Sequence, residues 1–259
     1  MEQTLTSSVE AIIKKAGKIL SDGFGTAFSV RNKQGVHNLV TEYDVRVEEF
    51  LFTELSNLVP GSGFIGEEGS GSNARNSCTW VVDPLDGTVN FAHGIPIFCV
   101  SIAAVIDGHI SLGVIHQPIV HELFTAVRGK GAMLNGTPIR VSDTTTLPES
   151  MLVTGFPYNV ADDPLNCIEQ LSAVLRMGIP IRRLGSAALD LAYTAAGRFD
   201  GFWEARLNTW DMAAGVLLVT EAGGTVTHYD GIPFVLSDNS IVATNGHIHA
   251  ALIEHLQTV

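Results

Sequence analysis

The segment Thr79–Phe91 constrains this chain most, because an apolar run ends within it in two aspartates, a proline and a glycine. Its residues Trp80–Val82 are typical of a strand that is covered on both faces. The proline fixes the backbone of the following turn, and Gly87 permits a positive φ. The pattern therefore predicts a buried strand whose end holds Asp83 and Asp86 close together in a rigid bend.

Two carboxylates in such a bend repel each other, and each is costly to bury without a cation. A hard divalent ion with oxygen ligands satisfies both, and the carbonyl of Leu85 between them is a further candidate ligand. If a helix begins after the bend, the amides of Gly87 and Thr88 face the same place, as helix N-termini do when they bind phosphate. These features indicate metal-assisted phosphoryl chemistry. A structural turn capped by aspartates explains the same residues without any function.

The bulk properties narrow the class of protein. The 259 residues suffice for one large or two modest domains, and a hydrophobic fraction of 46% excludes a disordered chain. A formal net charge of −12 argues against nucleic acid as a default partner, and an acidic protein that binds phosphate needs cations. Three cysteines without metal-type spacing, no secretory signal and no apolar run long enough to span a bilayer predict a cytoplasmic protein with no membrane association.

The first sixty residues carry two helical patterns, Ser7–Leu20 and Thr41–Leu58, and both begin with the spacing of a capping box. In the second box Asp44 has a simple capping role, although a carboxylate at a helix start can also face a site. The glycine-rich segment Ser21–Asn38 between the helices predicts irregular structure. Its Lys33 is interpreted as a solvated loop lysine on residue type alone.

Strand patterns fill the middle of the chain. A short strand at Phe64–Ile65 ends in a second pair of acids that includes Glu67, and the following Gly69–Ser77 reads as an exposed loop. Solvated loop acids are the alternative interpretation of that pair. The region Ile97–Ile139 predicts successive strands, paired antiparallel because Asp107-Gly108 forms a tight turn.

The last hundred residues alternate between helices and strands, which predicts a layered α/β unit. The expected order is helix 164–177, strand 179–184, helix 187–196, strand 199–204, helix 210–222, strands 225–229 and 241–244, and helix 247–256. The polar, threonine-rich segment Val141–Pro148 predicts a boundary between an N-terminal half, 1–145, and a C-terminal half, 146–259.

Two acids of the C-terminal half are site candidates. Asp211 begins a helix that is otherwise almost wholly apolar, so it either caps that helix or faces a site. Glu204 ends the neighbouring strand and is placed to face the same cleft.

Three separated motifs resemble the signatures of the inositol monophosphatase family. They are Gly66-Glu67-Glu68, Asp83–Phe91, and Trp210–Gly215 continuing to Glu221–Gly224. The resemblance runs from the first helix to the last. It implies a Mg²⁺-dependent, lithium-sensitive phosphomonoesterase with a layered α-β-α-β-α fold of mixed α+β and α/β character, assembled as a homodimer.

The resemblance also implies roles for individual residues. It places two or three Mg²⁺ ions per subunit on Glu67, Asp83, the carbonyl of Leu85, Asp86 and Asp211, with Lys33 in a flexible loop nearby. It assigns water activation to Asp44 and Thr88 together with Glu67, and phosphate binding to the amides of Gly87 and Thr88. Substrate hydroxyls are expected at Glu204 and at the turn Gly185, Ser186 and Ala187. The N-terminal half is then the metal- and phosphate-binding unit, and the C-terminal half adds Asp211 and the substrate contacts.

The substrate is less constrained than the chemistry. Compact length, a short 69–77 loop and the match at Glu204 favour inositol 1-phosphate, a small phosphate ester. Fructose 1,6-bisphosphate, histidinol phosphate and 3′-phosphoadenosine 5′-phosphate are the alternatives within the same resemblance. A regulatory binding protein that keeps the fold is a hypothesis of another class. The intact set of Glu67, Asp83, Asp86, Thr88 and Asp211 argues against an inactive enzyme and leaves a second role open.

Overall fold

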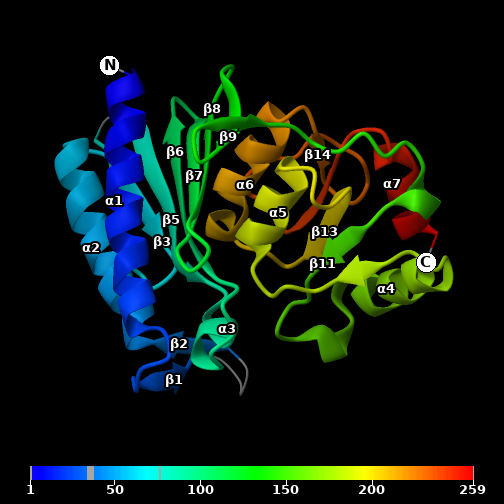
Figure 1. The fold of residues 1–259 in the computed structure, drawn as a ribbon, viewed down its shortest axis with the longest axis horizontal. Helices are drawn as coiled ribbons and strands as arrows, with labels where there is room; N and C mark the ends of the chain where they lie inside the picture. The colour runs from blue at the N-terminus through cyan, green and yellow to red at the C-terminus, as the bar shows by residue number, and fades with distance from the viewer. Residues whose placement is uncertain (1, 34–37, 76, 259) are drawn as a thin grey trace.

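The computed structural model describes residues 2–33, 38–75 and 77–258. Figure 1 shows five layers from left to right: a pair of helices, a large sheet, a second pair of helices, a smaller sheet and a last pair of helices. The predicted α-β-α-β-α arrangement is confirmed. The chain passes through the layers from the N-terminal helices on one side to the C-terminal helix on the other.

The first two layers come from the first 139 residues. The outer helices are α1 (Glu2–Gly23) and α2 (Glu42–Leu58). The large sheet contains β3 (Gly63–Gly66), β4 (Gly71–Ser72), β5 (Cys78–Asp86), β6 (Cys99–Ile106), β7 (His109–Gln117), β8 (Glu122–Val127), β9 (Gly131–Leu134) and β10 (Thr137–Ile139). Its order is β10-β9-β8-β7-β6-β5-β3-β4, and only β3 and β5 pair in parallel.

A small ribbon and a short helix complete this half. The ribbon pairs β1 (Val30–Asn32) with β2 (Leu39–Thr41), and α3 (Thr88–Ala92) follows β5. Both lie at the lower end of the large sheet in Figure 1.

The remaining layers come from the second half. The helices are α4 (Cys167–Arg176), α5 (Ala187–Ala195), α6 (Thr209–Glu221) and α7 (His249–Gln257), with three 3₁₀ turns, Leu147–Glu149, Val160–Asp162 and Pro164–Asn166. The smaller sheet contains β11 (Leu152–Thr154), β12 (Ile181–Arg182), β13 (Gly201–Ala205), β14 (Thr225–Thr227) and β15 (Ser240–Thr244), in the order β12-β11-β13-β15-β14. Strand β11 is parallel to both of its neighbours.

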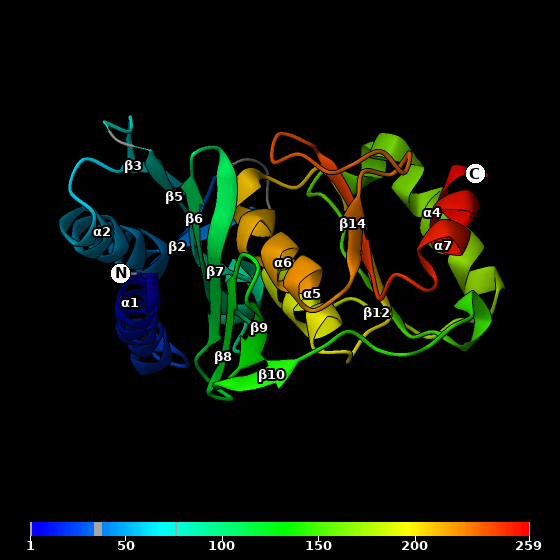
Figure 2. The ribbon, with the colours of Figure 1, turned by 90° about the horizontal axis from the view of Figure 1, so that it is seen from above.

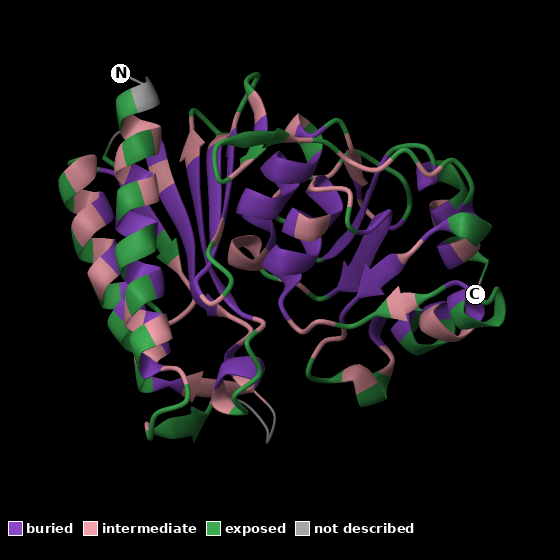
Figure 3. Cartoon of the chain, viewed as in Figure 1, coloured by how far each residue is buried: buried purple, intermediate pink, exposed green. Residues whose placement is uncertain are grey.

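Helices α5 and α6 lie between the two sheets, as Figure 2 shows from above. One apolar cluster joins them to both sheets, with Val81 from β5, Leu217 from α6 and Phe202 from β13 among its members. Figure 3 shows these two helices and the inner strands as the most continuously buried part of the chain. The predicted burial of α6 is therefore confirmed, and its physical cause is a sheet on either side.

The structure confirms the strand that carries the aspartates. Along β5, Trp80 and Val82 pack toward α1 and α2, whereas Val81 packs toward α5 and α6. Apolar residues on both faces are what a central strand between two helical layers requires. The tight turn at Asp107-Gly108 is also present, and both residues have positive φ.

Some local predictions are wrong. Helix α1 begins at Glu2, so Ser7 lies inside it and forms no capping box. The segment expected to be irregular contains β1, and its residues 34–37 lie outside the described part of the chain. The helix expected over 164–177 begins with a 3₁₀ turn in which Leu165 and Asn166 have positive φ. The boundary at Val141–Pro148 stays a prediction.

We predict that Gly113→Ala destabilises the fold by about 1–3 kcal/mol, the usual cost of overpacking. A Cβ at Gly113 of β7 would lie 2.8 Å from the carbonyl oxygen of Ala214 in α6, so a methyl group there must push helix and sheet apart. Urea unfolding measures the change. Gly71→Ala is the control, because the nearest atom there lies at 3.6 Å. An unfolding midpoint of Gly113→Ala equal to that of the wild type would contradict the prediction.

Candidate active site

The end of β5 forms the bend that the sequence predicts. The register with β6 shifts between Asp83 and Asp86, so the strand is interrupted where the aspartates stand. The amide of Leu85 donates to Oδ1 of Asp83 at 3.0 Å, which holds the bend closed. Gly87 follows with φ of 96°, and a Cβ there would lie 2.8 Å from the carbonyl oxygen of Ile97. Only glycine fits this position, where α3 starts.

Asp44 and Thr88, 44 residues apart in the sequence, meet at this bend. The Oγ1 of Thr88 lies 2.9 Å from Oδ1 of Asp44 and 3.0 Å from the carbonyl oxygen of Leu85. The other carboxylate oxygen of Asp44 accepts the amide of Thr41 at 2.7 Å and its hydroxyl at 2.6 Å, which is the predicted capping box. Burial raises the pKa of Asp44 to about 6, against the lowering effect of these hydrogen bonds.

Three aspartates gather from two elements. Asp83 and Asp86 come from β5, and Asp211 comes from the start of α6, where it closes a capping box with Asn208. Burial, and then the negative charge of Glu67 and the other two aspartates, raises the pKa of Asp83 well above its ordinary value. Burial and then the charge of Asp86 do the same for Asp211. Mutual repulsion of this kind requires that the carboxylates lie near one another.

Asp86 is tied to the substrate turn that the sequence predicts. Its Oδ2 accepts the hydroxyl of Ser186 at 2.7 Å and the amide of Ala188 at 2.7 Å, at the start of α5. Burial raises the pKa of Asp86 to about 6, although these hydrogen bonds lower it. The turn before α5 and the end of β5 are thus joined directly.

Asn90 makes a second connection between the two halves. Its Nδ2 donates to the carbonyl of Ile97 and to the carbonyl of Leu184, both at 2.8 Å. Gly185, with φ of 84°, turns the chain against this side chain. Sequence reasoning missed Asn90, and its position within the Asp83–Phe91 motif was the only available signal.

Lys33 and Glu67 form an ion pair at the edge of the site. The ammonium of Lys33 lies 2.9 Å from Glu67 and also contacts Glu68. Burial lowers the pKa of Lys33, but the attraction of the two carboxylates outweighs it and raises the pKa well above its ordinary value. Lys33 is therefore not the solvated loop lysine that residue type alone suggested.

Glu48 is a further residue that sequence reasoning missed. It is buried on α2, and its two carboxylate oxygens accept the amides of Glu68 and Ser70, each at 2.7 Å. These bonds fix the turn that carries Glu67. The available signal was an acid between Val47 and Leu51, on the apolar face of the helix.

Glu204 lies near the end of β13, with Asp211 and Asp86 among its charged neighbours. It is buried, and burial followed by the charge of Asp211 raises its pKa to about 8. Arg183, just before the turn at Gly185, is close enough to oppose this rise.

The donors suit a hard cation. Within residues 2–33, 38–75 and 77–258, no three His, Cys, Asp or Glu side chains are placed to enclose a metal ion by themselves. Mg²⁺ prefers oxygen ligands and is commonly held by one or two carboxylates together with a phosphate. The candidate ligands at the bend are carboxylate and carbonyl oxygens, and a cation there would offset the repulsion among the aspartates.

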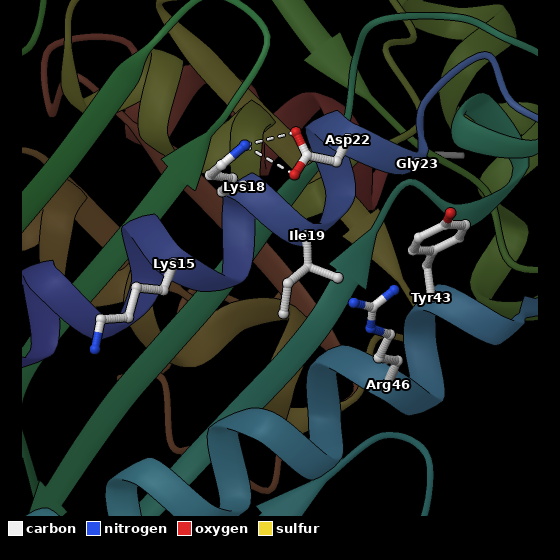
Figure 4. A pocket seen from close by; sticks show the side chains of 7 residues that line it. All are labelled: Lys15, Lys18, Ile19, Asp22, Gly23, Tyr43 and Arg46. Atoms are coloured by element: carbon white, nitrogen blue, oxygen red, sulfur yellow. Dashed lines mark hydrogen bonds and ion pairs between the residues drawn. The ribbon is translucent and has the colours of Figure 1, made fainter.

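A separate groove lies between α1 and α2. Figure 4 shows its lining residues, Lys15, Lys18, Ile19, Asp22, Gly23, Tyr43 and Arg46, around a volume of about 460 Å³. Lys18 and Asp22, one turn apart on α1, form an ion pair at 2.8 Å on one side of the groove. None of the predicted site residues lines this groove, although Tyr43 precedes Asp44 in the chain.

The five-layer fold and the carboxylate cleft are those of a class of phosphoric monoester hydrolases. The chain belongs to the inositol monophosphatase family, because its sequence matches that family over residues 1–259.

Named relatives and a solved structure agree with this. The inositol-1-monophosphatase of Mesorhizobium japonicum is 44% identical over 242 residues, covering 93% of this chain and 91% of that protein. The Nus factor SuhB of Pseudomonas aeruginosa is 43% identical over 231 residues, covering 87% and 85%. The crystal structure of the extragenic suppressor protein suhB from Bartonella henselae superposes with a TM-score of 0.93 at 42% identity, covering 98% of each chain.

Without divalent cations, we expect the free energy of unfolding to be larger near pH 5 than near pH 8. Unfolded carboxyl groups titrate near about 4, whereas the pKa values of Asp44 and Asp86 are about 6 and that of Glu204 is about 8. Between these values the folded state binds more protons, so stability falls as pH rises. Urea unfolding in a chelator, repeated with Mg²⁺, measures this. Stability that rises toward pH 8 in the chelator would be the contrary result.

We also expect Lys33→Gln to strengthen Mg²⁺ binding, because the ammonium no longer neutralises Glu67. The pair is partly exposed, so the gain should be at most about fivefold, or about 1 kcal/mol. Calorimetric titration of the metal-free protein measures it directly. Lys18→Gln, which removes an exposed ion pair on α1, is the matched control. Unchanged or weaker binding by Lys33→Gln would show that Lys33 does not compete with the metal.

Proposed function

We propose that this protein hydrolyses inositol monophosphate, with inositol 1-phosphate as the substrate and inositol and phosphate as products. Membership of the family supports the reaction, and the relative named inositol-1-monophosphatase supports the substrate. The observation that carries the proposal is the hydrogen bond between Thr88 and Asp44 beside the clustered aspartates.

Two or three Mg²⁺ ions per subunit belong to this proposal. Their ligands would be Glu67, Asp83, the carbonyl of Leu85, Asp86 and Asp211. When bound, the ions would offset the repulsion among the carboxylates, polarise the phosphoryl group and acidify a water.

Asp44 and Thr88 would move the proton. The single hydroxyl hydrogen of Thr88 has two acceptors within reach, Asp44 and the carbonyl of Leu85. When the Leu85 carbonyl binds a cation, the hydrogen would go to Asp44, and the Thr88 oxygen would accept a hydrogen bond from an attacking water. With a pKa of about 6, Asp44 is mostly ionised near neutral pH and can take up that proton. Burial within the capping box keeps its carboxylate oriented. Glu67 would be the third catalytic residue, acting at the same water.

The phosphate would bind at the start of α3. The positive φ of Gly87 brings the backbone round so that the amides of Gly87 and Thr88 follow the bend. Across the cleft, Glu204 and the turn Gly185, Ser186 and Ala187 would contact substrate hydroxyls. The bonds from Ser186 and Ala188 to Asp86 fix the separation of these two regions.

The remaining features of the proposal concern the whole protein. We infer a cytoplasmic homodimer, sensitive to lithium. The buried free thiols of Cys99 and Cys167 support a reducing compartment. Of the described helices, none combines the length and apolar character that a membrane-spanning segment needs.

Phosphate release from four esters tests the proposal. They are inositol 1-phosphate, fructose 1,6-bisphosphate, histidinol phosphate and 3′-phosphoadenosine 5′-phosphate, each with and without Mg²⁺ and Li⁺. We expect preference for inositol 1-phosphate, dependence on Mg²⁺ and inhibition by Li⁺. Thr88→Ala should lose about 100-fold or more in kcat, because it removes an oriented proton path.

Thr88→Ser is the matched control, because it keeps the hydroxyl. Calorimetric Mg²⁺ binding should persist in both variants. Normal turnover by Thr88→Ala would refute its role, and preference for another ester would replace the substrate while keeping the reaction.

Binding to another macromolecule is the second candidate function. The observation that favours it is the name Nus factor SuhB given to a relative with 43% identity. A partner that co-purifies in stoichiometric amount with an Asp86→Asn variant would support this function. A partner-free protein that is active on inositol 1-phosphate would weaken it.

A further inference from the structure

Glu204 lies directly against Gly155. Strand β11 ends at Thr154, which pairs in parallel with Trp203 of β13, so Gly155 runs alongside Glu204 at the next step of the register. A Cβ on Gly155 would overlap both carboxyl oxygens and Cδ of Glu204. The carboxyl group of Glu204 thus occupies the space that any other residue at position 155 would fill.

Space, not backbone conformation, is what requires glycine here. Gly155 is absent from the glycines with positive φ, so an alanine can adopt its backbone angles. The three atoms nearest to the missing Cβ all belong to the side chain of Glu204. A methyl group at this position must therefore displace Glu204 before it disturbs anything else.

Among the described residues, the Glu204 carboxyl forms no hydrogen bond or ion pair, and its oxygens keep some exposure to solvent. Asp190 of α5 lies nearby, is buried and also has no partner for either carboxylate oxygen. A fully buried carboxyl group without a donor, such as that of Asp190, is costly. The neighbouring Glu204 oxygens stay open to hydrogen bonds from a ligand that carries hydroxyl donors.

We propose that Gly155 is a positioning residue for Glu204, and that their contact makes the enzyme selective for phosphate esters of polyols over esters that lack hydroxyl groups. This inference rests on the proposed function, in which Glu204 contacts substrate hydroxyls. Gly155 itself touches no substrate. It leaves the room that the Glu204 carboxyl occupies beside the end of β11.

The experiment compares kcat/KM for inositol 1-phosphate with kcat/KM for p-nitrophenyl phosphate, which has no hydroxyl groups on its ring. The ratio is measured for the wild type, Gly155→Ala, Glu204→Ala and the double variant. Loss of one hydrogen bond to a polar partner should lower the ratio about tenfold in Gly155→Ala. In the Glu204→Ala background the new methyl group has space, so Gly155→Ala should change neither the ratio nor the melting temperature any further.

Gly17→Ala is the steric control. A Cβ at Gly17 of α1 would overlap the ring of His116, and neither residue is one of the proposed site residues. It should therefore lower the melting temperature without lowering the ratio. If Gly155→Ala alone does not fold, Glu204→Asp is the second test, because it withdraws the carboxyl from Gly155 by one methylene and should also lower the ratio.

The possible outcomes distinguish failure of this inference from failure of the proposed function. A lowered ratio in Glu204→Ala with a wild-type ratio in folded Gly155→Ala overturns this inference alone. Additive losses in the double variant overturn it as well, because the two residues then act independently. A wild-type ratio in Glu204→Ala or Glu204→Asp overturns the Glu204 contact on which it rests. No turnover of either ester overturns the proposed function.

Discussion

Repulsion among buried carboxylates is the constraint on which the rest of this structure depends. Asp83, Asp86 and Asp211 are held near one another by a strand end and a helix start. Asp86 and Asp211 raise the pKa of Asp83, and Asp86 raises that of Asp211. The fold must supply enough stability elsewhere to hold them there. It does so by placing α5 and α6 between two sheets, where one apolar cluster reaches both.

That constraint also explains how positive charge is placed in an acidic chain. With a net charge of −12, the protein cannot attract a phosphate through its overall field. Lys33 supplies a positive charge locally, because its ammonium pairs with Glu67 and Glu68. Glu67 is one of the proposed metal ligands. The electrostatic potential at these carboxylates therefore depends on whether Lys33 or a metal ion neutralises Glu67.

The strength of sequence reasoning differs from residue to residue. The end of β5 was predictable, because a strand covered on both faces leaves an apolar signature and its aspartates interrupt that signature. The capping box at Thr41 and Asp44 was predictable for the same local reason, since its partners lie three residues apart. Lys33, Glu48 and Gly155 were not, because each acts on a residue at least 20 positions away and tertiary packing alone brings them together.

Errors at segment ends have a related cause. The capping pattern at Ser7 is also compatible with a helix interior, and packing of α1 on the sheet extends the helix to Glu2. The ribbon of β1 and β2 contains only three residues in each strand, too few for a periodic signal.

The two hydrogen bonds of Asn90 fix the distance between two backbone segments of the site. One amide nitrogen spans the carbonyls of Ile97 and Leu184, so the backbone beside the phosphate end and the backbone before the turn at Gly185 keep a constant spacing. The same side chain belongs to the motif that carries the aspartates, so the bend and the turn before α5 are positioned by one amide group. Losing that amide would therefore disturb both halves of the site at once.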